Sequence, residues 1–140
     1  MNNIFDNVKT IAIVGLSDKP SRPSYEVGKY LLSKGFTIVP VNPNINTWEG
    51  IKAYPSLSSI PENIFIDVVD IFRKSEEVME TVEEAVLRGD AHTIWMQEGV
   101  KDEEAREYAE NHGLSVVMDF CLMIAHKSSL KQESSEVEIK

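Results

Sequence analysis

The stretch Thr10–Leu32, TIAIVGLSDKPSRPSYEVGKYLL, decides the fold of this chain. It begins with Ile11–Val14, an apolar run rich in β-branched residues that is typical of a strand buried on both faces. Gly15 and Ser17 follow where such a strand turns, and an apolar pattern with helical spacing comes next. A strand, a glycine turn and a helix form the phosphate-binding half of a mononucleotide-binding unit, although an ordinary connection in an α/β protein has the same features.

The turn carries only part of the dinucleotide-binding fingerprint. Where that fingerprint has three glycines, this chain has Gly15, Ser17 and Pro20. Prolines on both sides of Arg22 stiffen the connection, so a basic group is held above the expected helix N-terminus. We therefore predict a phosphate-binding loop that is not a standard NAD site. Gly28, one turn into the helix, is expected to allow the close packing of helix on sheet that the third glycine usually allows.

The rest of the chain alternates between strand and helix patterns. Four further strands are predicted at Phe36–Val41, Ile64–Phe72, Thr93–Met96 and Val116–Met118. Because each strand is followed by a crossover, these patterns predict an α/β fold: a Rossmann-like, doubly wound parallel sheet of five strands with helices on both faces.

The connecting segments have recognisable ends. One helix is expected to begin at the N-cap Ser75 and to end at Gly89, and another to begin at Asp102 and to end at Gly113. Residues 44–61 have no regular pattern, and we expect a loop that contains a short helix or turn.

Length and charge limit the classes of function. A chain of 140 residues suits one domain, which we place at residues 1–126, and the polar residues 127–140 are expected to form a disordered tail. No apolar run is long enough to span a bilayer and no signal peptide is visible, so we expect a cytoplasmic protein without membrane contact. The net charge of −9 argues against a nucleic-acid partner, although residues 1–60 carry a slight positive excess that would tolerate an anion. Cys121 is the only cysteine, so no internal disulfide can form.

Ligands bind sheets of this kind at the carboxyl ends of the strands. An NAD-binding fold usually has an Asp or Glu at the end of the second strand, whereas this chain has Asn42. An uncharged side chain tolerates a neighbouring phosphate that a carboxylate would repel. We favour a ligand contact for Asn42, and the alternative is an Asx turn before Pro43. Trp48 and Tyr54 could likewise flank an adenine or pin their own loop.

Five segments occur in a characteristic order and spacing: GLSDKPSRPSYEVGKYL, VPVNPN, VVDIFRKSE, WMQEGV and MDFC. In these segments the chain resembles the small stand-alone coenzyme A-binding domain proteins, whose fold is similar to the coenzyme A-binding domain of the succinyl-CoA synthetase α subunit. The resemblance covers Asn7–His126, nearly the whole expected domain. The family's last segment commonly contains a Cys-Pro-Lys run, whereas here Cys121 is followed by Leu122 and Met123. Any role of that proline and lysine is therefore in doubt for this chain.

The resemblance implies a set of cofactor-binding residues along the carboxyl edge of the sheet. They would surround the phosphates of the coenzyme (Gly15, Ser17, Arg22 and Ser24), shape its nucleotide end (Asn42 and Pro43), line the next stretch (Ile71, Phe72 and Arg73, with Val78 beneath) and lie near its pantetheine arm (Gln97, Glu98 and Gly99).

No catalytic or metal-binding set of residues accompanies these motifs. His92, His112 and His126 fall in unrelated segments, and Glu98 is more simply a solvated loop carboxylate than a general base. We therefore expect a protein that binds coenzyme A or an acyl-CoA without catalysis of its own. The alternative is a nucleotide-dependent enzyme, either an NAD(P)-dependent oxidoreductase or the nucleotide-binding subunit of a ligase. The sequence leaves open whether the chain forms a homodimer or serves another protein. Gly15→Val is expected to abolish binding and to leave the fold largely intact.

Overall fold

The computed structural model describes the backbone of residues 3–139 and the side chains of residues 3–132. Its centre is a sheet of parallel strands in the order β2-β1-β5-β6-β7. These strands are β1 (Thr10–Val14), β2 (Thr37–Val41), β5 (Val68–Ile71), β6 (Thr93–Met96) and β7 (Ser115–Val117). The chain first adds β2 on one side of β1 and then adds β5, β6 and β7 on the other side, so the strand order reverses between β1 and β5. The predicted five-stranded, Rossmann-like sheet is confirmed.

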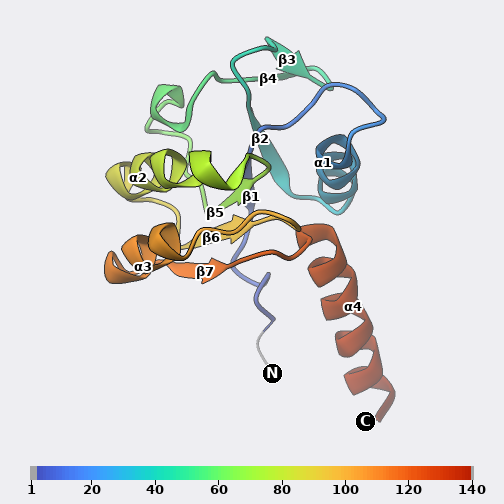
Figure 1. The fold of residues 1–140 in the computed structure, drawn as a ribbon. Coiled ribbons are helices and arrows are strands. Elements are labelled where there is room, and N and C mark those ends of the chain that lie inside the picture. Colours follow the sequence, from blue (N-terminus) through green and yellow to red (C-terminus); the bar gives the residue numbers. More distant parts are fainter. Residues whose placement is uncertain (1–2, 140) are drawn as a thin grey trace.

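Helices cover both faces of this sheet (Figure 1). The helices α1 (Pro23–Ser33) and α4 (Leu122–Ile139) lie on one face. The helices α2 (Val78–Arg88) and α3 (Glu103–Asn111) lie on the other face. A short 3-10 helix, η2 (Ser75–Glu77), leads directly into α2. The sheet is therefore the middle of three layers.

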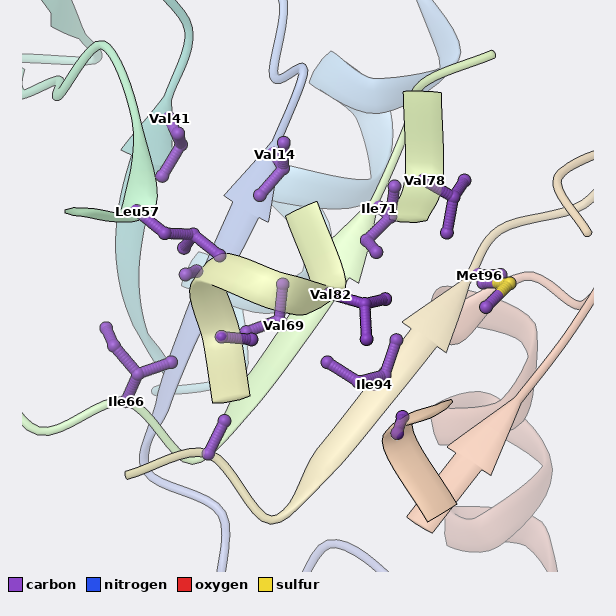
Figure 2. Close-up of a cluster of buried hydrophobic side chains, with 14 of the residues drawn as sticks. Val14, Val41, Leu57, Ile66, Val69, Ile71, Val78, Val82, Ile94 and Met96 are labelled. Carbon is purple, nitrogen blue, oxygen red and sulfur yellow. The ribbon is translucent and has the colours of Figure 1, made fainter. Parts of the chain in front are cut away.

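Buried apolar side chains form one cluster for each face of the sheet. The cluster beneath α2 and α3, shown in Figure 2, includes Val14 and Val82. The cluster beneath α1 and α4 includes Ile13 and Leu122. Burying each such side chain contributes about 1.5–3 kcal/mol. Because successive residues of a strand point to opposite faces, each continuous apolar run of the sequence contributes residues to both clusters.

The connection between β2 and β5 is more regular than the sequence predicts. It contains a two-stranded hairpin, β3 (Thr47–Trp48) with β4 (Ile51–Lys52), and a 3-10 helix, η1 (Leu57–Ser59). Trp48 is only 1% exposed, and its Nε1 donates a hydrogen bond to the carbonyl oxygen of Ser17 at 3.1 Å. Its indole ring therefore pins the loop after β1 and presents no face to a ligand.

The predicted helix ends are partly correct. Asp102 caps α3 by accepting a hydrogen bond from the backbone N–H of Ala105 at 3.0 Å, and Gly89 is the C-cap of α2. Ser75 is not an N-cap, because it is the first residue of η2 and its Oγ accepts a hydrogen bond from the backbone N–H of Lys101 at 3.1 Å. That contact spans two loops, which a pattern along the sequence does not show.

The strand predicted at residues 64–72 is shorter in the structure. Ladder pairing is limited to Val68–Ile71. The backbone N–H of Ile66 instead donates to Oδ2 of Asp90 at 2.9 Å, although the Ile66 side chain is fully buried. Phe65 is 62% exposed, so the apolar run continues here beyond both the strand and the buried core.

The segment from residue 127 also differs from the sequence expectation of a disordered tail. The helix α4 continues from Leu122 to Ile139, and Figure 1 shows it extending past the body of the sheet. His126 anchors its first turns, because its Nδ1 lies 2.7 Å from the hydroxyl oxygen of Tyr30. A helical segment and a disordered tail can share a polar composition, so composition alone did not separate them. Lys140 lies outside the described residues. Across residues 3–139, no helix combines the length and the apolar character that crossing a membrane requires.

Candidate functional site

Two adjoining hollows lie at the carboxyl ends of β1, β2 and β5. The α1-side hollow, next to the loop after β1 and the start of α1, has a volume of about 520 Å³. The α2-side hollow, between η1 and the start of α2, has a volume of about 400 Å³. Gly15, Asn42, Asn44 and Phe72 border both hollows. The pair therefore spans the point where the chain reverses its direction across the sheet, which is where ligands bind in this architecture.

Internal hydrogen bonds hold the loop from Gly15 to Ser24 in place. The backbone N–H of Gly15 donates to the carbonyl oxygen of Val41 at 2.8 Å. The backbone N–H of Ser17 donates to Oγ of the buried Ser24 at 2.9 Å, and Oγ of Ser17 accepts a hydrogen bond from the backbone N–H of Lys19 at 3.1 Å. Ser17 and Ser24 thus brace the loop, a role that the sequence did not indicate, while both also border the α1-side hollow.

Asn42 forms the Asx turn that was the alternative to a ligand contact. Its Oδ1 accepts a hydrogen bond from the backbone N–H of Asn44 at 2.8 Å, and its Nδ2 donates to the carbonyl oxygen of Leu16 at 3.0 Å. The side chain therefore ties the end of β2 to the loop after β1. Asn42 nevertheless borders both hollows, and Pro43 borders the α2-side hollow.

The two hollows differ in charge. The α1-side hollow is lined by Lys19 and Arg22 against the single acid Asp18. Arg22 is the N-cap residue of α1, its side chain makes no capping hydrogen bond, and no salt bridge engages it within residues 3–132. The α2-side hollow has Arg73 and Lys74 but also three glutamates, Glu77, Glu80 and Glu84. Nε of Arg73 pairs with Oε2 of Glu77 at 3.1 Å. The α1-side hollow is therefore the better place for an anion.

Five of the predicted cofactor-binding residues border neither hollow. Ile71 and Val78 are 0% exposed in the core, as Figure 2 shows, so their side chains support the site from below. Gln97 is also buried, and its Oε1 accepts a hydrogen bond from the backbone N–H of Leu122 at 3.0 Å. Glu98 and Gly99 lie exposed on the next loop.

That loop after β6 is joined to the segment that precedes α4. The backbone N–H of Gly99 donates to Oδ1 of Asp119 at 2.6 Å, and the backbone N–H of Phe120 donates to the carbonyl oxygen of Met96 at 3.2 Å. Together with the Gln97–Leu122 hydrogen bond, these contacts fix the loop at the β6 side of the two hollows.

Several residues that line the hollows were not among the predicted ones. Lys19 and Lys74 lie within two of the segments that carry the resemblance, and their charge was the available signal. Asn44, Ile45 and Ser56 come from the connection between β2 and β5. The sequence could not place these three, because no helix or strand pattern positions that connection.

Asp70, which the sequence analysis did not assign to the site, is an unusual residue of β5. It is 0% exposed, and neither carboxylate oxygen has a hydrogen-bond partner within the described residues. Burial raises the pKa of this carboxyl well above its ordinary value of 3.8. Asp70 is therefore protonated over a wider pH range than a solvated aspartate.

Asp70→Asn is expected to stabilise the protein at pH 7.5 by about 1–2 kcal/mol, within the usual range for a stabilising substitution. Because the folded-state pKa of Asp70 is raised, its contribution to stability is fully present below the unfolded-state pKa and is lost as the pH rises through the folded-state value. The amide has no such titration, so the gain should shrink as the pH falls toward 4. Urea denaturation at pH 4.5, 6 and 7.5 measures it. A gain that is equal at all three pH values would contradict the titration.

The chain belongs to the CoA-binding domain family, whose pattern it matches over residues 9–127. It is 41% identical over 126 residues to the uncharacterized protein YneT of Bacillus subtilis, covering 90% of this chain and 91% of YneT. The solved structure of a hypothetical protein from Pyrococcus horikoshii is also similar, with 41% identity, a TM-score of 0.86, and coverage of 91% of this chain and 87% of that one.

A longer enzyme is a more distant relative. The α subunit of ADP-forming acetate–CoA ligase II from Pyrococcus furiosus is 28% identical over 134 residues, which cover 89% of this chain and 29% of the subunit. The chain thus spans less than a third of that ligase subunit.

Proposed function

We propose that this protein binds coenzyme A or an acyl-CoA across the two hollows, in the cytoplasm and without a catalytic step of its own. The observation that carries the proposal is the basic α1-side hollow, which Gly15 and Arg22 border. This hollow lies where the strand order reverses, between β1 and β5, in a chain of the CoA-binding domain family. Membership of the family supports the choice of coenzyme A over other nucleotides.

The phosphates of the coenzyme would occupy the α1-side hollow. Lys19 and Arg22 supply positive charge there, and the N-terminal end of α1 adds the partial positive charge of the helix dipole. The glutamates of the α2-side hollow would repel phosphate. The uncharged pantetheine arm would instead run past Phe72 toward the loop that begins at Gln97.

Coenzyme A is expected to bind at least tenfold more tightly than dephospho-coenzyme A, and NAD more weakly still. The three ligands share an adenosine diphosphate, and only coenzyme A carries the 3′-phosphate. A charged hydrogen bond from arginine to that phosphate is worth about 1.5–3 kcal/mol, or roughly ten- to a hundredfold in affinity. Titration calorimetry with the three ligands measures the ratio, which should narrow at higher salt.

Arg22→Ala should narrow the preference for coenzyme A over dephospho-coenzyme A to less than about threefold. The reason is that Arg22 lines the hollow without a salt-bridge partner among residues 3–132. Arg106→Ala is the matched control, since Arg106 is an exposed arginine on α3 that pairs with Glu103. Equal affinity of the wild-type protein for coenzyme A and its dephospho form would remove the support for the charge argument. Tighter binding of NAD would favour the oxidoreductase alternative.

The similarity to the ligase α subunit favours a second candidate, the nucleotide-binding part of a ligase. In that case the chain would need a further polypeptide for the ATP-dependent chemistry. A tagged form of the protein, isolated from its own cells and mixed with ATP, acetate and coenzyme A, should release no ADP if our proposal is correct. ADP release that requires all three compounds, together with a second polypeptide in the isolated fraction, would favour the ligase.

A further inference from the structure

Asp70 is the penultimate residue of β5, two residues before Phe72, which borders the proposed binding site. Its strand β5 pairs with β1. Val14, at the end of β1, borders the α2-side hollow, and Phe72, directly after β5, borders both hollows. The side chain is 0% exposed and both oxygens are unpartnered within the described residues. A buried polar group without a partner costs about 1–3 kcal/mol, so it calls for an explanation.

The other buried or half-buried polar groups near this strand have clear structural uses. Gln97 is buried too, and it bonds the backbone of Leu122. Asp67 accepts hydrogen bonds from the backbone N–H groups of Lys9 and Thr10, both at 2.9 Å. The side chain of Asp70 makes no hydrogen bond within the described residues, so a structural role of that kind does not explain its presence.

The surroundings of Asp70 are apolar. Along β5, alternation places Val68, Asp70 and Phe72 on the face that α1 and α4 cover. The residues paired with Asp70 on the neighbouring strands are Ile13 and Trp95, and both belong to the apolar cluster of that face. Apolar surroundings of this kind disfavour a phosphate much more strongly than an uncharged group that contains a carbonyl.

Phe72 stands between Asp70 and the hollows. It follows Asp70 by two residues on the same face, a distance of about 7 Å along a strand. Phe72 is half-buried and borders both hollows. Phe72 is therefore the residue on this face whose side chain would have to move for a ligand in the hollows to reach Asp70.

We propose that Asp70 is a ligand-binding residue whose neutral carboxyl donates a hydrogen bond to a carbonyl oxygen of the uncharged arm of coenzyme A when the Phe72 side chain turns aside. The acceptor is a pantetheine amide or, in an acyl-CoA, the thioester carbonyl. This inference rests on the proposed function. It assigns the arm to the face of the sheet beneath α1 and α4, and it gives the unpartnered carboxyl a partner in the bound state.

The test separates the two ends of the ligand. Calorimetry compares coenzyme A with adenosine 3′,5′-bisphosphate, which lacks the arm, for the wild-type protein and three variants. Asp70→Val removes the donor, and it should weaken coenzyme A at least tenfold but change bisphosphate binding less than twofold. Asp70→Asn keeps a donor and an acceptor, so its affinity for coenzyme A should stay within threefold. Ile13→Val, in the same cluster, is the control and should change neither affinity.

Thermal melts of all four proteins test whether each is folded. A folded Asp70→Val protein that binds coenzyme A as the wild type does would overturn the inference and leave Asp70 a residue of the core alone. An equal loss for both ligands would also overturn it, because the effect would then be on the fold of the site. Failure of the wild-type protein to bind coenzyme A would instead refute the proposed function, and the inference with it.

Discussion

Replacing Gly15 by alanine is expected to destabilise the protein by about 4 kcal/mol or more. Gly15 has a φ of +86°, and a Cβ at this position would lie 2.2 Å from the carbonyl oxygen of Phe72. The opposing atom belongs to the backbone, which the hydrogen bond from Phe72 N–H to the carbonyl oxygen of Val14 holds at 2.8 Å. No side-chain rotation relieves this contact, so strain and collision act together.

Gly35→Ala is the matched control for the backbone conformation. Gly35 has a φ of +94°, but apart from its own chain neighbours no residue comes within 4 Å of the position that a Cβ would take there, so only the strain of the left-handed conformation remains. We expect a loss of about 1 kcal/mol. Urea denaturation compares the two variants. Similar losses at the two positions would show that the close approach of Phe72 to Gly15 has no energetic consequence.

The contact with Phe72 argues against the sequence expectation that Gly15→Val leaves the fold largely intact. The sequence identified Gly15 as a place where backbone comes close to a phosphate, which predicts lost binding in an intact fold. The structure shows that the backbone carbonyl of Phe72, just after β5, approaches Gly15 first. Any larger side chain there disturbs the fold, so lost binding in such a variant would not locate the ligand. Arg22 is the better residue for that purpose, because its exposed side chain makes no capping hydrogen bond.

The central strands were predictable because burial on both faces leaves a continuous apolar run. The strand Thr93–Met96 occurs with the predicted bounds, and the first strand extends the predicted Ile11–Val14 by one residue. Gly28 was also recognised as a packing position, but its close neighbours are the side chains of Trp48 and Leu16. The hairpin that delivers Trp48 has strands of two residues, too short for a pattern along the sequence to register.

The sequence located those parts of the candidate site that follow from backbone shape and loop charge. The resemblance located Gly15, Arg22 and Phe72, which do border the hollows. The resemblance could not separate residues that line the site from residues that support it, because both kinds occur next to each other in the same motif. Ile71 is the clearest example: it directly precedes Phe72 in the chain, yet its side chain points into the core on the opposite face (Figure 2).

Long-range polar contacts were the least predictable part, and Arg88 is the chief example. Arg88 is the last residue of α2, and its side chain is only 10% exposed. It donates hydrogen bonds to the carbonyl oxygens of Ile60 at 2.6 Å and Ile64 at 2.8 Å, and it pairs with Oδ2 of Asp90 at 3.0 Å. The contact thereby secures the segment that follows η1, and η1 contributes Leu57 to the wall of the α2-side hollow.

Arg88→Ala is expected to destabilise the protein by about 3–5 kcal/mol, because it leaves a largely buried carboxylate and backbone carbonyl groups unpaired. Burial alone would raise the pKa of Asp90, but hydrogen bonds from Arg88 and from the Ile66 N–H outweigh burial and lower it below 3.8. The stabilisation is therefore present at neutral pH and is lost as the pH falls below 3.8 through the folded-state value.

Urea denaturation at pH 7 and pH 3 tests the Arg88 prediction. The variant should lose most of its stability relative to the wild type at pH 7. The difference should be smaller at pH 3, because pH 3 lies below the unfolded-state pKa of 3.8 and part of the stabilisation is already lost there. Arg106→Ala is the control, because the Arg106–Glu103 pair has exposed side chains and is worth about 1 kcal/mol at most. If Arg88→Ala cost no more than Arg106→Ala, the buried pair would not be what holds the segment after η1. If it costs several times more, the wall of the α2-side hollow depends on one arginine that no sequence motif identifies.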